Sequence, residues 1–113
     1  AKDKLTYAQE SFAEGKWSDA VYHAYAGFVN GAKAILLSED QKTNHHAGII
    51  NLFDTVFVDT NKIVLNSTFA DLVYQINQNQ PTEEFAKKYI QEATDFFVNI
   101  ENYRIKDLAN EIS

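Results

Sequence analysis

The sequence contains no cysteine, no methionine and only one proline among its 113 residues. Without cysteine, the chain can form neither disulfide bonds nor the thiolate sites that hold structural zinc and iron–sulfur clusters. We therefore expect no cofactor in this domain and a reducing, cytoplasmic location. Methionine is missing even at position 1, so we expect residues 1–113 to be a single domain excised from a longer protein.

Long apolar runs and an excess of basic residues are also missing. No apolar stretch approaches the roughly 20 residues that a membrane-spanning helix needs. Sixteen acidic residues outnumber ten basic ones and give a net charge of -6, and Arg104 is the single arginine. The lack of a long apolar run means that we expect no membrane as a partner. Because proteins bind duplex nucleic acid through clustered lysines and arginines, we expect no duplex nucleic acid as a partner either.

Apolar residues recur at helical spacing along almost the whole chain, without strand-like alternation. Gly15 stands where a helix can end in the left-handed conformation, and Ser18 is the natural N-cap of the next helix. Pro81 precedes Thr82, a second N-cap residue that two glutamates follow. The pattern predicts an all-α, five-helix up-and-down bundle, with helices over 2–14, from Trp17 or Ser18 to 37, from after Thr43 to 58, over 68–78, and from 82 to beyond 104.

One segment, "EGKWSDAVYHAY", resembles half of a tetratricopeptide unit, a repeat of about 34 residues. At about that distance along the chain the sequence reads "HAGIINLFDTVF", in which no glycine stands 34 residues after Gly15, no small residue stands 34 residues after Ala20, and no tyrosine occurs. A solenoid needs several stacked units to bury its core. The sequence therefore favours a bundle over a repeat array.

Three segments together are typical of one helical family: "AEGKWSDAVYHAYAGFVNGAKAILL", "NHHAGIINLFDTVFV" and "PTEEFAKKYIQEATDFFVNI". In them a first helix that glycine terminates precedes a long, alanine-rich second helix. Over nearly its whole length the chain resembles the HEPN family (higher eukaryotes and prokaryotes nucleotide-binding). Within that family it is most similar to the helical tail at the C-terminal end of some bacterial nitrite and sulfite reductase proteins, on "YHAYAGFVNGAKAILL" and "QINQNQPTEEFAKKYI".

The resemblance also indicates which chemistry to look for. Catalytic members of the HEPN family are metal-independent RNases, in which a histidine follows an arginine after four to six residues; the imidazole handles the proton and the guanidinium holds phosphate. No histidine follows Arg104 in this sequence. The resemblance therefore implies that this domain is not itself an enzyme, and that any oxidoreductase activity belongs to the rest of the parent protein.

The adjacent histidines do not predict a metal site. His45 and His46 point about 100° apart on a helix, and neither has a carboxylate one turn away. His46 shares the apolar stripe of Ile49 and Phe53. We expect it to face inward, as a hydrogen-bonded core or helix-start histidine.

A narrow polar strip on the second helix is the candidate ligand site. It contains Tyr22, His23, Asn30 and Lys33 on a helix that is otherwise almost entirely apolar. Such a strip could form a shallow cleft for a nucleotide or a peptide group. The alternative is a partly exposed face of a central helix with no ligand.

The fifth helix carries a second candidate surface. Val98, Ile105 and Ile112 recur every seven residues on a side that the core stripe does not use. This spacing is typical of a seam for a partner helix. Related helical domains often pair, so we expect a homodimer or docking onto the parent protein; the alternative is a frayed C-terminus.

Taken together, these patterns predict a non-catalytic helical accessory domain for protein interaction or dimerisation, forming the C-terminal tail of a bacterial nitrite or sulfite reductase. The alternative is a HEPN domain that binds a nucleotide or another small ligand and acts beside a nucleotidyltransferase. Nothing within the 113 residues decides between these two hypotheses.

Overall fold

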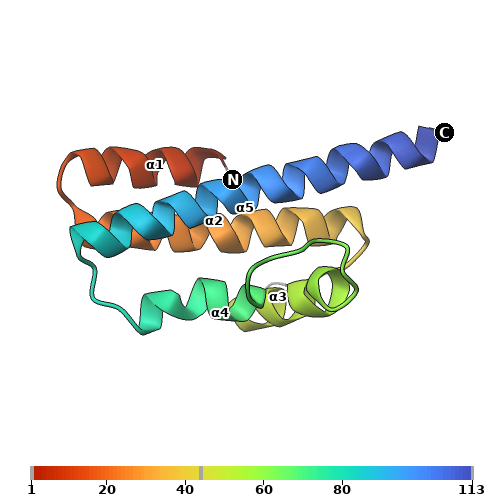
Figure 1. Ribbon diagram of the computed structural model, residues 1–113, viewed down its shortest axis with the longest axis horizontal. Coiled ribbons are helices and arrows are strands. Elements are labelled where there is room, and N and C mark those ends of the chain that lie inside the picture. The colour runs from red at the N-terminus through yellow and green to blue at the C-terminus, as the bar shows by residue number, and fades with distance from the viewer. Residues whose placement is uncertain (1, 44, 113) are drawn as a thin grey trace.

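The computed structural model describes residues 2–43 and 45–112, and side chains for 4–43 and 45–109. Within this part of the chain every regular element is helical, and five α-helices are present, so the all-α, five-helix prediction is confirmed (Figure 1). They are α1 (Lys2–Ala13), α2 (Trp17–Ser38), α3 (His46–Phe53), α4 (Phe69–Val73) and α5 (Glu83–Ile112). A π-helical turn, η1 (Asp54–Val58), continues α3, and a 3-10 turn, η2 (Tyr74–Asn77), continues α4.

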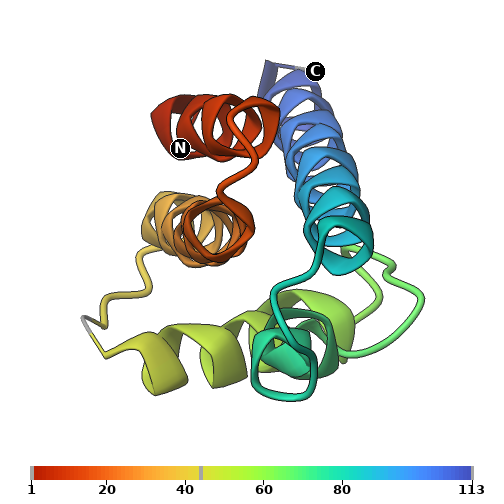
Figure 2. The same cartoon turned by 90° about the vertical axis from the view of Figure 1, so that its left-hand side faces the viewer.

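The helices form two layers. Figure 2 shows α1, α2 and α5 grouped together, with the shorter α3 and α4 lying across one side of this group. In Figure 1, α2 and α5 run in the same direction, because the chain passes through the second layer between them. The molecule measures 47 × 25 × 24 Å, and its long dimension matches the roughly 45 Å expected for the 30 residues of α5.

Four phenylalanines, one from each of four helices, form the centre of the core. Phe28, Phe53, Phe69 and Phe96 are each at most 1% exposed. Their ring centroids lie 4.4 Å apart for Phe53 and Phe69, and 4.9 Å apart for Phe69 and Phe96. Such aromatic contacts stabilise a core beyond the burial of area alone. They join α2 and α5 to the second layer.

The turn between α1 and α2 confirms one prediction and corrects another. Gly15 adopts φ +77°, and the N–H of Lys16 donates to the carbonyl of Ser11 at 2.9 Å, which closes α1 as predicted. The prediction of Ser18 as N-cap was wrong. Lys16 holds the cap position without a side-chain hydrogen bond, and α2 begins at Trp17.

The third helix ends at Val58 as predicted, but its last turn is π-helical. The expectation that His46 faces inward was wrong, because its side chain is exposed at the first residue of α3. Its Nδ1 lies 3.1 Å from the hydroxyl of Tyr25, so it is hydrogen-bonded at a helix start. The apolar stripe of α3 therefore begins only at Ile49, which is buried.

The predicted N-cap of the last helix, Thr82, is confirmed, and the structure adds an N-cap at Thr68. Thr68 accepts a hydrogen bond from the N–H of Asp71, and Thr82 accepts one from the N–H of Phe85, both at 3.1 Å. Between η1 and α4, Ile63 is only 2% exposed and fixes the intervening loop to the core. The long α5 then extends beyond the ends of the other helices (Figure 1).

Candidate interaction surface

Helix α5 presents two different faces. On the inner face, Tyr89, Ala93 and Phe96 are at most 1% exposed. On the outer face, Val98 is 57% exposed and Ile105 is 60% exposed. The third predicted interface residue, Ile112, has its side chain outside the described residues. The separation of this seam from the core is therefore confirmed for Val98 and Ile105.

The structure adds Leu108 to the outer face, where it is 55% exposed. Val98, Ile105 and Leu108 are spaced by seven and three residues, so they fall on one side of the helix. We call these three residues the α5 stripe. Exposed apolar side chains that gather on one face indicate a contact surface more strongly than the same residues scattered singly.

The C-terminal part of α5 forms an overhang. We use this name for residues 104–112, which follow the last contact of α5 with the bundle described here. That contact is made by Tyr103, whose hydroxyl donates to Oε1 of Glu39 at 2.8 Å and whose ring lies 5.4 Å from that of Phe57. Every residue from 104 to 109 is exposed. Residues 104–109 of the overhang are thus largely open to solvent.

Tyr103 is held in its protonated form. Burial, and then the hydrogen bond to Glu39, raise the pKa of the Tyr103 hydroxyl to about 12. The phenol therefore remains a hydrogen-bond donor throughout the neutral range. It ties α5 to the end of α2 immediately before the overhang begins.

A groove of about 550 Å³ lies between α1, α2 and α5, next to the stripe. Gly31 of α2 forms part of it, and a Cβ at this position would lie 2.8 Å from Cε1 of Phe97. The absence of that atom lets Phe97 lie directly on α2. The groove is lined mostly by apolar side chains, those of Leu5, Ala34, Ile35, Phe97, Val98 and Ile100, with Thr94, Glu101 and Arg104 at its edge along α5.

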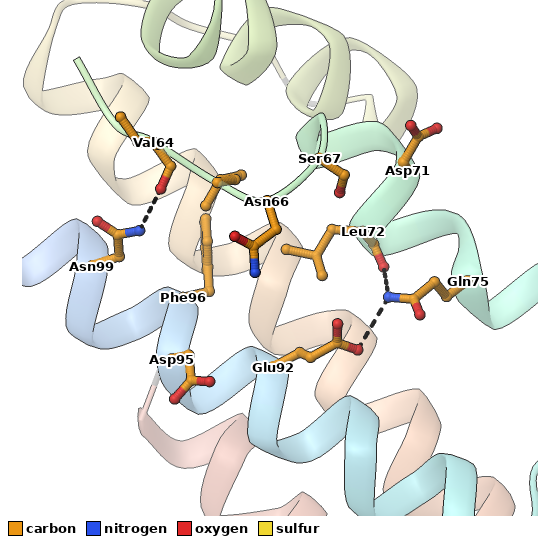
Figure 3. A pocket seen from close by; sticks show the side chains of 11 residues that line it. Val64, Asn66, Ser67, Asp71, Leu72, Gln75, Glu92, Asp95, Phe96 and Asn99 are labelled. Atoms are coloured by element: carbon orange, nitrogen blue, oxygen red, sulfur yellow. Dashed lines mark hydrogen bonds between the residues drawn. The ribbon is translucent and has the colours of Figure 1, made fainter. Parts of the chain in front are cut away.

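A second, polar pocket of about 340 Å³ lies between the 64–67 loop, α4 and α5 (Figure 3). Gln75 organises one wall: its Nε2 donates to Oε1 of Glu92 at 3.1 Å, and its Oε1 accepts from Lys88 at 3.0 Å. Opposite, Nδ2 of Asn99 donates to the carbonyl of Val64 at 3.0 Å. Sequence reasoning missed this pocket, because its residues come from three separate segments without a shared motif.

The strip predicted as a ligand site lies on one face of α2, outside the groove and the polar pocket. Tyr22 is 61% exposed, Asn30 is exposed, and His23 and Lys33 are half-buried. Tyr22 and Lys33 are eleven residues apart, or about 16 Å along the helix. None of the four lines the groove or the polar pocket. The ligand role of these residues stays a prediction, while the expected cleft was not found among the described pockets.

His23 is the most constrained member of the strip. Its ring packs 5.7 Å from that of Tyr7 on α1 and 5.9 Å from that of Tyr22. Its Nδ1 is buried without a hydrogen-bond partner. Packing between α1 and α2 is thus enough to explain the position of His23, and no ligand is needed to account for it.

Residues 1–107 match the sequence model of the HEPN domain. The chain belongs to the HEPN domain family. A protein of Methanocaldococcus jannaschii named "Putative toxin MJ0605" is 32% identical over 119 aligned positions, which cover 99% of this chain and 85% of that protein. No solved structure matches this HEPN domain.

The structure does not bring an arginine and a histidine of this HEPN domain together. Arg104 lies on the exposed overhang of α5. His46 is bonded to Tyr25 at the start of α3, and His23 packs between Tyr7 and Tyr22. No hydrogen bond within residues 4–43 and 45–109 links Arg104 to a histidine.

Among the residues that the structure describes, no three histidine or acidic side chains gather as a metal site would require. None of the described helices is both long and apolar enough to cross a lipid bilayer. The clearest functional feature is thus the α5 stripe with the groove beside it.

Proposed function

We propose that this HEPN domain is a non-catalytic accessory domain that acts through protein contacts on the outer face of α5. The observation that supports this is the α5 stripe: three large apolar side chains, each more than half exposed, continue from an apolar groove onto an overhang. Exposing this surface is unfavourable in water, and covering it with a partner would stabilise the complex. The lack of a histidine after Arg104 supports the non-catalytic part of the proposal.

RNA cleavage is the direct test of the non-catalytic role. The purified domain is incubated with single-stranded RNA in the presence of a chelator, because HEPN RNases need no metal and contaminating nucleases often do. We expect the RNA to stay intact. Cleavage that disappears in Arg104→Ala but persists in a control variant, Lys62→Ala, would overturn the proposal.

A toxin is the second candidate function. It is favoured by the Methanocaldococcus jannaschii relative, which is named as a toxin and is 32% identical over almost the whole chain. Induced expression in a bacterial host separates the two candidates. The accessory role predicts normal growth, whereas growth arrest that Arg104→Ala relieves would favour the toxin.

A nucleotide-binding role rests on the strip of α2, where an exposed tyrosine, an asparagine and a lysine share one face. A ligand that binds only the folded state adds RT ln(1 + [L]/Kd) to stability, about 2.7 kcal/mol at 100 times Kd. Thermal unfolding with a panel of nucleotides measures this gain. The accessory role predicts that no nucleotide changes the midpoint temperature of unfolding. A rise in this temperature that is lost in Lys33→Ala and kept in Lys62→Ala would favour the nucleotide binder beside a nucleotidyltransferase.

A finer proposal concerns the parent protein. The segments "YHAYAGFVNGAKAILL" and "QINQNQPTEEFAKKYI" resemble the tails of bacterial nitrite and sulfite reductases, and this resemblance supports docking of the domain onto such a redox enzyme. Translation of the DNA upstream of the codon for Ala1 tests it. A reductase reading frame continuous with Ala1 is expected, and a transferase frame or a start codon there would contradict it.

A further inference from the structure

The polar pocket between the 64–67 loop, α4 and α5 plays no part in the proposed role of the α5 stripe. Its volume of about 340 Å³ lies at the lower end of the roughly 300–1,000 Å³ that is usual for ligand pockets. Leu65, Leu72 and Phe96 give part of its lining an apolar character. The amide of Asn66 and the carboxylate of Glu92 point into the space between the loop and α5 (Figure 3). The pocket is therefore large enough for one small group with both polar and apolar parts.

All charged side chains that line the pocket are acidic. They are those of Asp71, Glu92 and Asp95, and the lining includes no lysine, arginine or histidine. None of these three carboxylates forms an ion pair among the described side chains. A lysine does reach the wall of the pocket, but Nζ of Lys88 donates to the amide oxygen of Gln75 and not to a carboxylate. The pocket thus presents negative charge that no salt bridge within the described chain balances.

The side chains that α5 contributes have hydrogen-bond acceptors to spare. Glu92 uses Oε1 to accept from Gln75, and Asp95 uses Oδ1 to accept from Gln91. Asn99 donates through its Nδ2 to a backbone carbonyl. The second oxygen of each carboxylate and the amide oxygen of Asn99 have no hydrogen bond among the described side chains. Because these three residues are spaced by three and four positions, their free oxygens belong to one face of α5.

This lining suits an organic cation better than a metal ion. Metal ligands must converge within about 2–2.6 Å of one point, and no three histidine or acidic side chains of the described residues gather in that way. A guanidinium is planar, always charged and carries five N–H donors, so it can bond several separate acceptors at once. The aliphatic stem of an arginine would lie against apolar side chains such as Leu65 and Leu72.

We propose that this pocket binds a guanidinium group, which a partner protein presents as an arginine side chain. The net charge of -6 attracts a basic partner surface at long range. A side chain suits the pocket better than free arginine, because no cationic lining residue is present to bind the α-carboxylate of a free amino acid. The inference goes beyond the proposed role of the α5 stripe, and neither depends on the other.

Titration with a blocked arginine, N-acetyl-arginine amide, tests the pocket directly. We expect saturable shifts of the backbone amide resonances of residues 64–67 and 92–99, and none at 104–109. The neutral analogue N-acetyl-citrulline amide should bind at least about tenfold more weakly, because it cannot form charge-assisted hydrogen bonds. N-acetyl-lysine amide should also bind more weakly, since an ammonium has only three donors. No binding of the blocked arginine, or equal binding of either analogue, would overturn the guanidinium assignment.

One substitution in the pocket has a matched control outside it. Glu92→Gln removes a negative charge and keeps an amide oxygen that can accept from Gln75, so we expect the fold to persist and the blocked arginine to bind about tenfold more weakly. Asp59→Asn removes the same charge from an exposed position that does not line the pocket. Thermal unfolding checks that both variants fold. Equal weakening in both would mean that net charge, and not the pocket, attracts the cation.

Two further arms identify the source of the group and separate this inference from the proposed function. Free arginine carries an additional carboxylate that the acidic pocket repels, so it should bind more weakly than the blocked form; tighter binding of free arginine would overturn a partner protein as the source. Ile105→Asp changes only the α5 stripe and should bind the blocked arginine as the unmodified chain does. A loss of binding in Ile105→Asp would contradict the independence of the two surfaces, whereas RNA cleavage would overturn the non-catalytic role alone.

Discussion

Two glycines of α2 differ in what surrounds them. A Cβ on Gly31 would lie 2.8 Å from Cε1 of Phe97 and 3.3 Å from Cδ1 of Ile100. A Cβ on Gly27 would meet the nearest atoms of Phe97 at 3.5 Å, which is ordinary contact. The close approach of α5 to α2 therefore depends on Gly31 in particular.

Alanine substitution tests this difference. Gly31→Ala should lower the free energy of unfolding by about 1–2 kcal/mol, because the extra methyl group overpacks the contact with Phe97. Gly27→Ala, the matched control, should leave stability unchanged or raise it by up to about 1 kcal/mol, since alanine favours the helix. Urea unfolding of both variants gives the two values, and equal destabilisation would contradict the packing argument.

Tyr103 permits a prediction about pH. Its pKa is raised from an ordinary value of 10.0 to about 12 in the folded chain, so folding favours the protonated phenol. The resulting stability is fully present below pH 10 and is lost as pH rises through about 12. Tyr103→Phe should lower stability at neutral pH by about 0.5–1.5 kcal/mol, the usual contribution of one hydrogen bond.

The alkaline part of the curve provides the sharper readout. The Tyr103→Phe substitution removes one group whose pKa is raised by folding. The stability of this variant should therefore fall less steeply above pH 10 than the stability of the unmodified chain. Burial also raises the pKa of Tyr89, and this residue contributes to the alkaline loss of stability in both the variant and the unmodified chain. Tyr7→Phe is the control, since Tyr7 is 48% exposed. Identical alkaline slopes for the Tyr103→Phe variant and the unmodified chain would argue against a raised pKa of Tyr103.

At the scale of elements, the shortest α-helix depends on the π-helical turn. Helix α4 has five residues and would be marginal alone. The carboxylate of Asp54, the first residue of η1, accepts hydrogen bonds from the N–H of Phe69 at 2.6 Å and from that of Ala70 at 3.0 Å. A negative group at a helix N-terminus satisfies free N–H groups and interacts favourably with the helix dipole.

Asp54→Ala should therefore lower the free energy of unfolding by about 2 kcal/mol, because two partly buried N–H groups lose their charged acceptor. Chemical denaturation measures the loss. The control is Asp59→Ala, an exposed carboxylate just after η1, which should change stability by less than about 0.5 kcal/mol. A similar small effect of both substitutions would mean that Asp54 does not hold α4 in place.

On the scale of the whole molecule, helical periodicity was enough to predict the fold class and the five helices. Gly15 and Thr82 were predictable because a left-handed helix end and an N-cap depend on local sequence. The N-cap of α2 was not, since Lys16 occupies the cap position, without a side-chain hydrogen bond, in a helix that tertiary packing stabilises. The exposure of His46 was missed for a related reason: periodicity cannot tell where along an apolar stripe the core begins.

The candidate surface was only partly predictable. The seven-residue spacing of Val98 and Ile105 indicated a seam outside the core. The groove beside it could not be predicted, because it depends on how α1 and α2 pack against α5. The overhang could not be predicted either, because its extent depends on where the other helices of the bundle end, and local sequence patterns do not indicate this. The strip on α2 was predictable as a shared helix face, but its residues line neither the groove nor the polar pocket. A pocket also needs neighbouring elements that enclose it, and a helix face alone does not indicate them.

Amide hydrogen exchange of the overhang is the most direct test that the outer face of α5 is a contact surface. Alone, residues 104–109 form exposed helix with no tertiary support and should exchange rapidly. We predict that their protection rises with protein concentration in the unmodified chain and stays low in Ile105→Asp, while residues 77–80, which are also exposed, exchange rapidly in both. Rapid exchange of residues 104–109 at every concentration would contradict the account.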